Sequence, residues 1–418
     1  MSVWANHSIP HSLNKAPTVK KIVIRGLSRT KEIVVRRELL FKEDQVLTPE
    51  ALLSSVQRLK NLRIFSKVLP YLALQKNNQV ILTIDVVEKW TTIPYFSFSS
   101  GGDTFYANAG IYDINSFGRY IETGIQYDNW NGKSGGTFWF RNPRFLHKRL
   151  LAGFTLGSTT RPWQLYTIDG EHQGKYILEK KMLNILFKKE LKIWLEAGIT
   201  LGFREDKIVE SSPTEKIDAN TLQLLSKHNK TRETSITTSL RVGKLNYDNY
   251  LVRGKQSTIY FKYADEKIGS DKTIRKIQWK NLIFWRLPFK GNFGLRFNAA
   301  AIDTQDIQNY FYIGGFENIR GYFDGQFRSK VYGQFNAEYR IPSFQHDWLV
   351  IQHIFFIDAA RTANNFDNFK TAKNIYSAGI GVRVISPRIY SFNGRIDIAL
   401  ISSQKAASYI SFGAQQFF

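Results

Sequence analysis

The sequence contains no cysteine, which excludes a disulfide framework, a thiolate metal centre and a cysteine nucleophile. It also lacks long hydrophobic runs. No stretch approaches the roughly 20 consecutive apolar residues that a membrane-spanning helix needs. Strands that cross a membrane alternate apolar and polar side chains, so a search for long apolar runs does not detect them. If the chain crosses a membrane, we expect it to do so with strands.

Acidic residues are scarce, with 35 Asp and Glu against 58 Lys and Arg, and the formal net charge is +23. Such an excess suggests a polyanionic partner, and nucleic acid is the usual first candidate. The basic residues are spread along the whole chain, however, and no recognition motif accompanies them. We therefore expect no nucleic-acid partner. Acidic lipid head groups or a basic lumen would explain the charge equally well.

Motifs for catalysis and metal binding are missing as well. The seven histidines form no H-E-x-x-H motif, and the one H-x-x-x-H pair, His7 and His11, has Pro10 between its members, which disfavours the helix such a pair needs. Ser134 stands in a G-x-S-x-G pattern, 132–136, but no helix is expected after it, so it forms no nucleophile elbow. No glycine-rich phosphate loop precedes a helix. The sequence therefore predicts no catalytic residues, no metal site, no cofactor and no enzymatic activity.

The chain begins with a polar segment, 1–18, which contains Pro10 and Pro17 and is expected to form a flexible lead. It shows no charged region followed by an apolar region, so no signal peptide is visible. Either the numbering starts after removal of such a peptide or the protein reaches its membrane by another route.

Residues 19–89 show the sequence patterns of a small domain that contains both helices and strands. The segment 19–24 is rich in β-branched residues and predicts a strand, and 29–40 has helical spacing. Thr48 followed by Pro49 predicts a helix start, because Pro is favoured at the first helical position. Two β-rich runs follow, 64–74 and 80–87, separated by an Asn-containing turn. The predicted order is β-α-α-β-β.

Helical periodicity disappears after this domain, and period-2 alternation continues to the last residue. In 334–341 and 391–398, for example, every second residue is polar. A soluble β-sandwich also alternates, but about 330 residues of strand with no second architecture favour a barrel. We therefore predict a mainly β fold, with a 16-stranded antiparallel transmembrane β-barrel over 91–418. Its first strand is expected near 93–100 and its last near 407–418.

The connections between these strands are of two kinds. Tight turns are expected at 115–118, 287–290 and 386–388, whereas 206–232 and 303–329 are long and polar. Short turns on one side and long loops on the other are typical of outer-membrane barrels. A sheet that spans hydrocarbon must also leave no open edge, because lipid satisfies no backbone hydrogen bond.

The segment 310–341 is the most informative. It contains Gly314-Gly315, then Ile319-Arg320-Gly321-Tyr322, then a strand that ends in Glu338-Tyr339-Arg340-Ile341. Together with Phe355-Phe356-Ile357-Asp358 and the β-α-α-β-β unit, this pattern resembles the BamA/TamA superfamily, whose members join POTRA domains to a surface-antigen-type barrel. The resemblance covers about 20–418.

That resemblance implies that the loop 303–329 folds back into the lumen with the motif 319–322 at its tip. It also implies an outer membrane of a Gram-negative-type envelope, or an organellar outer membrane, with the POTRA-like domain on the periplasmic side. The partners implied are the lipid bilayer, unfolded or extended polypeptide clients, and accessory envelope proteins.

The residues themselves support a role for Arg320. A guanidinium carried into a lumen is costly unless a carboxylate meets it, and the planar arginine fork suits carboxylates. Glu338 and Asp358 fall on the polar phase of their strands. Our hypothesis is that Arg320 bonds Asp358, Glu338 or both.

The C-terminus ends in Phe418, with Gly413 five positions earlier. This ending resembles the barrel-assembly signal of bacterial outer-membrane proteins, which implies that Phe418 helps the chain itself to be inserted. The alternative is a plain edge strand that ends in Phe. Gly413 is also a candidate weak point of the last strand.

The favoured function is insertion or translocation of polypeptides through a laterally gated barrel. Clients would add as strands to the first–last strand seam and to the edge near 64–74. A single POTRA-like unit leaves open a specialised paralogue, a two-partner secretion relative or an organellar assembly barrel. Two other classes remain as alternatives, a passive diffusion pore without polypeptide clients and an envelope enzyme.

Overall fold

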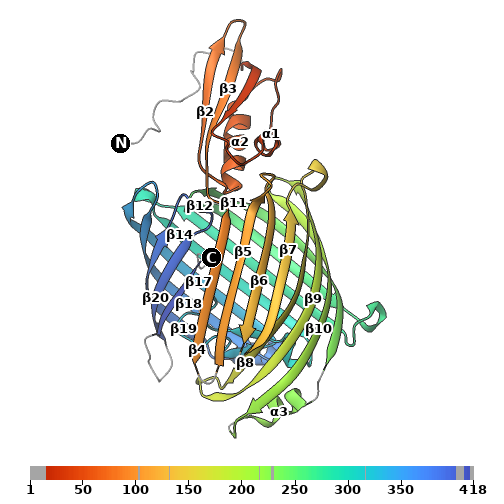
Figure 1. Cartoon of the computed structure of the whole chain (residues 1–418). Helices are drawn as coiled ribbons and strands as arrows, with labels where there is room; N and C mark the ends of the chain where they lie inside the picture. The colour runs from red at the N-terminus through yellow and green to blue at the C-terminus, as the bar shows by residue number, and fades with distance from the viewer. Residues whose placement is uncertain are drawn as a thin grey trace.

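The computed structural model describes residues 16–418 except 102–103, 131, 216, 227–229, 316, 402–408 and 415–418. A small domain of strands and helices stands on one end of a large curved antiparallel sheet (Figure 1). The predicted mainly β fold, with one POTRA-like domain before a sheet of 16 strands, is confirmed.

The N-terminal domain contains, in chain order, β1 (Thr18–Arg25), α1 (Glu32–Arg36), α2 (Pro49–Asn61), β2 (Phe65–Gln75) and β3 (Gln79–Glu88). Its sheet has the order β1-β3-β2, in which β1 and β3 are parallel and β2 and β3 antiparallel. The β-α-α-β-β order matches the prediction, and β2 lies at an edge of the sheet.

Local chemistry explains the helix starts in this domain. The Thr48 hydroxyl accepts a hydrogen bond from the backbone N–H of Ala51 at 3.2 Å, and Pro49 opens α2. The expected helix 29–40 is shorter, because only Glu32–Arg36 is helical. The helices bury Val35 and Leu59 against Leu82 and Ile84 of the central strand, which gives the domain its own core.

The large sheet follows the chain order without interruption except for one inserted hairpin. The order of hydrogen-bonded strands in the sheet is β21-β20-β19-β18-β17-β14-β13-β12-β11-β10-β9-β8-β7-β6-β5-β4. The strands are β4 (Thr92–Gly101), β5 (Thr104–Ser116), β6 (Ile121–Trp130), β7 (Lys133–Asn142), β8 (Leu150–Tyr166), β9 (His172–Lys192), β10 (Leu195–Pro213), β11 (Thr231–Asp248), β12 (Leu251–Ala264), β13 (Ile274–Arg286), β14 (Asn292–Asp303), β17 (Val331–Gln345), β18 (Val350–Ala363), β19 (Ile375–Ile385), β20 (Asn393–Ile401) and β21 (Tyr409–Ala414).

The sheet curls until its first and last parts meet beneath the N-terminal domain (Figure 1). Trp90, just before β4, forms a parallel bridge with Ile389 in the turn before β20. Its N–H donates to the Arg388 carbonyl at 2.8 Å, and its own carbonyl accepts from Tyr390 N–H at 2.8 Å. The start of β4 is therefore fixed beside the β19–β20 turn.

Alternation along the strands divides polar from apolar residues between the two faces of the sheet. In β17, Asn336, Glu338 and Arg340 are fully buried on the inner face, whereas Phe335 and Tyr339 are exposed on the outer face. An outer face of exposed aromatic and aliphatic residues suits a lipid environment, and the polar inner face suits a lumen.

The connections differ between the two ends of the sheet, as expected. The turns at 115–118, 287–290 and 386–388 are short, and Gly118 lies against the N-terminal domain through a hydrogen bond from Lys31. The expected loop 206–232 is shorter at its start than predicted, because β9 and β10 continue to pair as far as Gly174 and Pro213. The connection between β10 and β11 is 214–230 and includes α3 (Ala219–Ser226).

Short helices occupy several other connections. They are η1 (Phe145–His147), η2 (Glu266–Ile268), η3 (Pro288–Lys290), η4 (Ile307–Asn309) and α4 (Phe366–Thr371). In the part of the chain that the structure describes, no helix combines the length and the apolar character needed to cross a membrane.

The described part of the last strand, β21 (Tyr409–Ala414), pairs with β20, with Gly413 opposite Arg395. Phe418, the other residue of the C-terminal signal, lies outside the described residues.

Candidate functional site

The segment between β14 and β17 lies inside the curved sheet and crosses it from wall to wall. It carries the two-stranded hairpin β15 (Phe311–Ile313) and β16 (Phe327–Ser329). On one side Tyr312 packs on Trp163 of β8 with ring centroids 4.4 Å apart, and its hydroxyl is 2.8 Å from that of Tyr176 of β9. Phe323 stacks on Tyr166 at 5.0 Å.

The same segment reaches the opposite wall through Tyr322 and Gly321. The Tyr322 hydroxyl donates to the carbonyl of Tyr376 on β19 at 2.9 Å. Gly321 faces β20 so closely that a Cβ added to it would lie 2.5 Å from the Cγ2 of Ile401. Contacts with both walls mean that this segment, 304–330, obstructs the interior as a plug.

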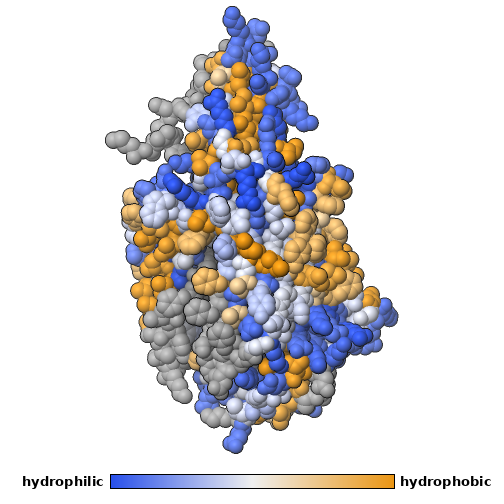
Figure 2. All heavy atoms as spheres, viewed as in Figure 1, coloured by the Kyte–Doolittle hydropathy of each residue, from blue (hydrophilic) through white to orange (hydrophobic). Residues whose placement is uncertain are grey.

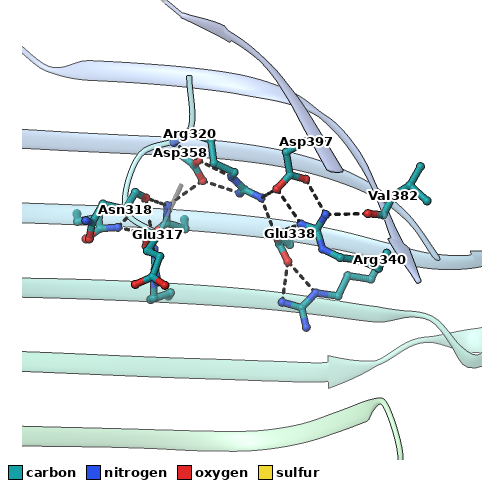
Figure 3. Close-up of polar contacts among 12 residues, drawn as sticks. Glu317, Asn318, Arg320, Glu338, Arg340, Asp358, Val382 and Asp397 are labelled. Atoms are coloured by element: carbon teal, nitrogen blue, oxygen red, sulfur yellow. Dashed lines mark hydrogen bonds and ion pairs between the residues drawn. The ribbon is translucent and has the colours of Figure 1, made fainter. Parts of the chain in front are cut away.

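Arg320 lies at the centre of this site, fully buried (Figure 3). Its Nε and Nη2 donate to the two oxygens of Asp358, each at 2.8 Å, and its backbone N–H donates to Asp358 Oδ2 at 3.1 Å. Its Nη1 donates to Glu338 Oε1 at 2.5 Å. Arg320 therefore bonds both carboxylates that the sequence singled out.

Glu338 is a hub that joins Arg320 to two further arginines (Figure 3). Its Oε2 accepts from Arg340 Nη2 at 2.6 Å, and its Oε1 accepts from Arg383 Nη2 at 3.2 Å. Arg383 also donates to Asp397 Oδ1 at 2.7 Å. Strands β17 to β20 thus each contribute a charged side chain to one network.

All of these side chains are excluded from solvent, with an exposed fraction of 0% on both partners of each pair around Arg320. Buried charges are tolerated only where partners compensate their desolvation. Two-pronged arginine–carboxylate geometry provides that compensation and fixes orientation. The Arg320 guanidinium also lies 3.5 Å from the ring centroid of Phe356.

Glycine allows the loop to reach this position. Gly314, Gly315 and Gly321 have φ values of +120°, +81° and +90°, in a region that L side chains rarely adopt. At Gly315 an added Cβ would lie 2.8 Å from the Cα of Asp324. The tight turns before and after Arg320 therefore require glycine on grounds of both conformation and space.

Sequence reasoning missed part of this network. Arg383 and Asp397 complete it, and Asn336 donates to Asp358 Oδ1 at 2.8 Å. Their signal was the polar phase of alternation on β17, β19 and β20. Alternation predicts whether a side chain faces inward or outward, but not its position along the barrel axis. It therefore could not indicate which inward-facing residues contact one another.

The arrangement holds a loop in place and offers no evident reactive group. Every carboxylate of the network is engaged by arginine. Among the described residues, no group of three His, Asp or Glu side chains could hold a metal ion.

A second network, which the sequence did not reveal, fixes the N-terminal domain to the end of the sheet. Glu38 is buried and accepts from Arg58 of α2 at 2.7 Å. It also accepts from Arg144, in the β7–β8 turn, at 2.8 and 2.9 Å. Arg58 further pairs with Glu190 of β9 at 3.2 Å.

The charge state of Glu38 follows from these contacts. Burial raises its pKa, but hydrogen bonds and attraction from Arg144, together with the attraction of Arg58, outweigh burial and leave the pKa below its ordinary value. Nearby, Lys60 pairs with Asp248 at 3.1 Å and Asn61 bonds Asn246 at 3.0 Å. The domain is therefore attached by charged and polar contacts, beside which Ile114 of β5 and Tyr390 pack against the core of the domain.

This combination defines a class of protein, a strand-built envelope barrel whose lumen holds its own arginine loop and whose mouth carries a POTRA-type domain. The chain belongs to the Omp85 superfamily, whose domain matches residues 115–418. Residues 17–89 match the POTRA family described as surface antigen variable number repeat.

A curated relative supports this assignment. The chain is similar to an outer membrane protein assembly factor BamA from Neorickettsia risticii, with 25% identity over 272 residues that cover 63% of this chain and 34% of the relative. The match thus spans about a third of the length of that relative.

Solved structures share the fold. One is BamA from Haemophilus ducreyi lacking POTRA domains 1–3, with a TM-score of 0.57, 17% identity, and coverage of 96% of this chain and 84% of that one. Another is CdiB from Escherichia coli, with a TM-score of 0.66, 12% identity, and coverage of 95% and 75%.

Proposed function

We propose that this chain inserts or translocates polypeptides at the outer membrane of a Gram-negative-type envelope, with its N-terminal domain in the periplasm. The observation that carries the proposal is the plug. Segment 304–330 contacts β8 and β9 on one wall and β17 to β20 on the other. A lumen obstructed in this way suits lateral delivery of a polypeptide better than passive diffusion of solutes.

The N-terminal domain offers a place for client capture. Strand β2 has a free side in the sheet order, and Leu69, Tyr71 and Leu74 are exposed on it. An exposed strand edge with apolar side chains pairs readily with an extended peptide by β-augmentation. The interface centred on Glu38 holds this edge above the end of the barrel.

The ends of the sheet offer a second place for strand addition. The sheet order ends at β4 and β21, and within the described residues no ladder joins these two strands. Because the described residues of these two end strands share no ladder, we infer that the seam opens laterally and that incoming strands pair with its edges.

The Arg320 network stabilises the part of the sheet next to this seam. It joins the loop to β17, β18, β19 and β20, the strands that precede β21. We infer that the network keeps this wall folded while β21 moves. The proposal requires no catalytic residue and no cofactor. Accessory envelope proteins remain a prediction.

Reconstitution tests the proposal. The full chain is placed in liposomes and an unfolded, labelled barrel protein is added, with protein-free liposomes and liposomes holding an unrelated barrel of similar size as controls. We expect faster client insertion than in either control. Insertion no faster than with the unrelated barrel, for clients kept on either side of the membrane, would reject the proposal.

The diffusion-pore alternative gives a different result in the same membranes. A plugged lumen should show only small or brief currents in planar bilayers, because the loop contacts both walls. A large steady conductance would favour the pore.

A further inference from the structure

The outer face of the large sheet is hollowed over strands β6 to β11. The hollow has a volume of about 910 Å³, and Ile125, Phe138, Leu156, Leu183 and Phe203 are among the side chains that line it. Small residues contribute to it, because Gly136 and Ser158 face each other across β7 and β8, whereas the next pair on the same face is Phe138 and Leu156.

Two adjacent rows of side chains, each running across neighbouring strands, line the hollow. One row is mostly apolar and the other is polar and charged. One row runs Phe138, Leu156, Leu183, Phe203 and Thr234 through successive ladder pairs and is mostly apolar. The next row, farther from the N-terminal domain, runs Gly136, Ser158, Lys181, Glu205 and Arg232. Figure 2 shows an apolar band on the side of β9 and β10 that gives way to hydrophilic surface away from the N-terminal domain.

Basic side chains outnumber acidic ones at the boundary between the two rows. Glu205 pairs with Lys230 at 3.0 Å and with Arg232 at 3.6 Å, and Lys181 lies opposite it in the ladder. Asp271 accepts from the Arg232 backbone N–H at 2.6 Å. Three cations therefore face two carboxylates, and over the described residues Lys181 forms no ion pair. Lys181, Lys230 and Arg232 are exposed.

The height of the charged row fits a lipid interface. Glu205 lies ten residues beyond Leu195, where β10 begins on the side of the N-terminal domain. At ~3.3 Å per residue this is about 33 Å of strand, and a tilt of roughly 40° leaves about 25 Å of height, the thickness of the apolar band of a membrane barrel.

We propose that this hollow binds an anionic lipid of the leaflet opposite the N-terminal domain. Its phosphate meets Lys181, Lys230 and Arg232, and its acyl chains lie on Phe138, Leu156 and Phe203. The inference rests on the proposed placement of the sheet in an outer membrane. Basic side chains just above an apolar strip attract such headgroups, and the hollow gives the chains a recess that flat barrel surface lacks.

The experiment uses the absence of native cysteine. Ile236→Cys, on the outer face of β11 beside the hollow, carries a fluorophore, and Leu240→Cys, nearer the N-terminal domain on the same strand and face, is the reference position. The full chain is reconstituted in phosphatidylcholine vesicles that contain either brominated phosphatidylcholine or brominated phosphatidic acid as quencher.

We expect phosphatidic acid to be preferred at position 236 and not at 240. Lys181→Gln and Arg232→Gln should each lower that preference about fivefold. Lys189→Gln, an exposed lysine on the same strand and face as Lys181, should leave it unchanged.

Equal quenching by both lipids at 236, or a preference that survives Lys181→Gln with Arg232→Gln, would overturn the proposal. Displacement by inorganic phosphate as effective as by the lipid would do so as well, because the apolar row would then contribute nothing. If neither lipid quenches either position, the sheet is not in the bilayer and the proposed function fails with the site.

Discussion

At the residue scale, the interaction of Arg320 with Asp358 and Glu338 is the strongest constraint on the lumen loop. Arg320→Ala leaves Asp358 without its arginine, and Glu338 with only Arg340 and Arg383, in a site with no solvent access. Removing one member of a buried pair costs about 3–5 kcal/mol. We expect a comparable loss of barrel stability in urea unfolding followed by the shift in electrophoretic mobility.

A double-mutant cycle isolates the pairing. Arg320→Ala and Asp358→Ala should be strongly non-additive, because the second change removes a charge that the first has already left unpaired. Arg253→Ala, at an exposed arginine of β12, is the matched control and should have little effect. Additive losses from the two substitutions would show that the pair contributes little.

Gly321 tests whether the loop tip needs glycine for space as well as for conformation. Its φ of +90° and its close approach to Ile401 both disfavour a Cβ, whereas Gly132, with φ +80°, has open space around it. We expect Gly321→Ala to destabilise the barrel clearly more than Gly132→Ala, since only the first adds a clash to the backbone strain. Protease sensitivity of the loop provides the measurement, and equal effects would contradict the packing.

The sequence predicted these residues unevenly, for a physical reason. Arg320, Glu338 and Asp358 could be anticipated because the family resemblance implies that the loop enters the lumen, where its charge needs a partner, and alternation shows which carboxylates face inward. Arg383 and Asp397 could not, because their meeting depends on how far each strand is shifted against its neighbours. Register is a property of the whole sheet, and a single strand does not carry it.

At the scale of elements, the strand order followed from alternation and turn chemistry, whereas lengths and interfaces did not. β9 and β10 extend past the predicted loop start because their pairing continues to Pro213. The interface of Glu38 with Arg144 joins residues 106 positions apart in the sequence. No local pattern marks such a contact.

That interface predicts a pH response. The pKa of Glu38 is depressed in the folded protein, so its contribution is fully present above its ordinary value of 4.5 and is lost as pH falls through the lowered value. We expect the domain to detach from the barrel end in acid before either part unfolds. Spin-label distances between the exposed residues Leu53 and Leu146 would report the movement.

Glu38→Gln is the matched variant, since it keeps the shape and removes the charge. It should give the detached state already at neutral pH and abolish the acid transition. Lys67→Gln, which breaks the exposed pair with Asp347, should change neither, because exposed pairs contribute little. An unchanged transition in Glu38→Gln would assign the response to another group.

At the scale of the whole molecule, two rigid attachments lie on either side of a weakly joined seam. The Glu38 interface fixes the capture domain, and the Arg320 network fixes the wall formed by β17 to β20. Among the described residues, β21 is the end strand that follows this wall, and β4 is the end strand on the other side of the seam. The bridge from Trp90 to Ile389 holds the near end of the seam together, so opening is expected to begin at the far end.

The most direct measurement is client insertion with the seam locked. Because the chain has no cysteine, pairs introduced into β4 and β21 give defined crosslinks without background. Insertion of a labelled barrel protein into liposomes is then scored before and after oxidation, with single-cysteine variants as controls. We predict that oxidation stops insertion and that reductant restores it. Full insertion activity in the crosslinked protein would contradict lateral opening.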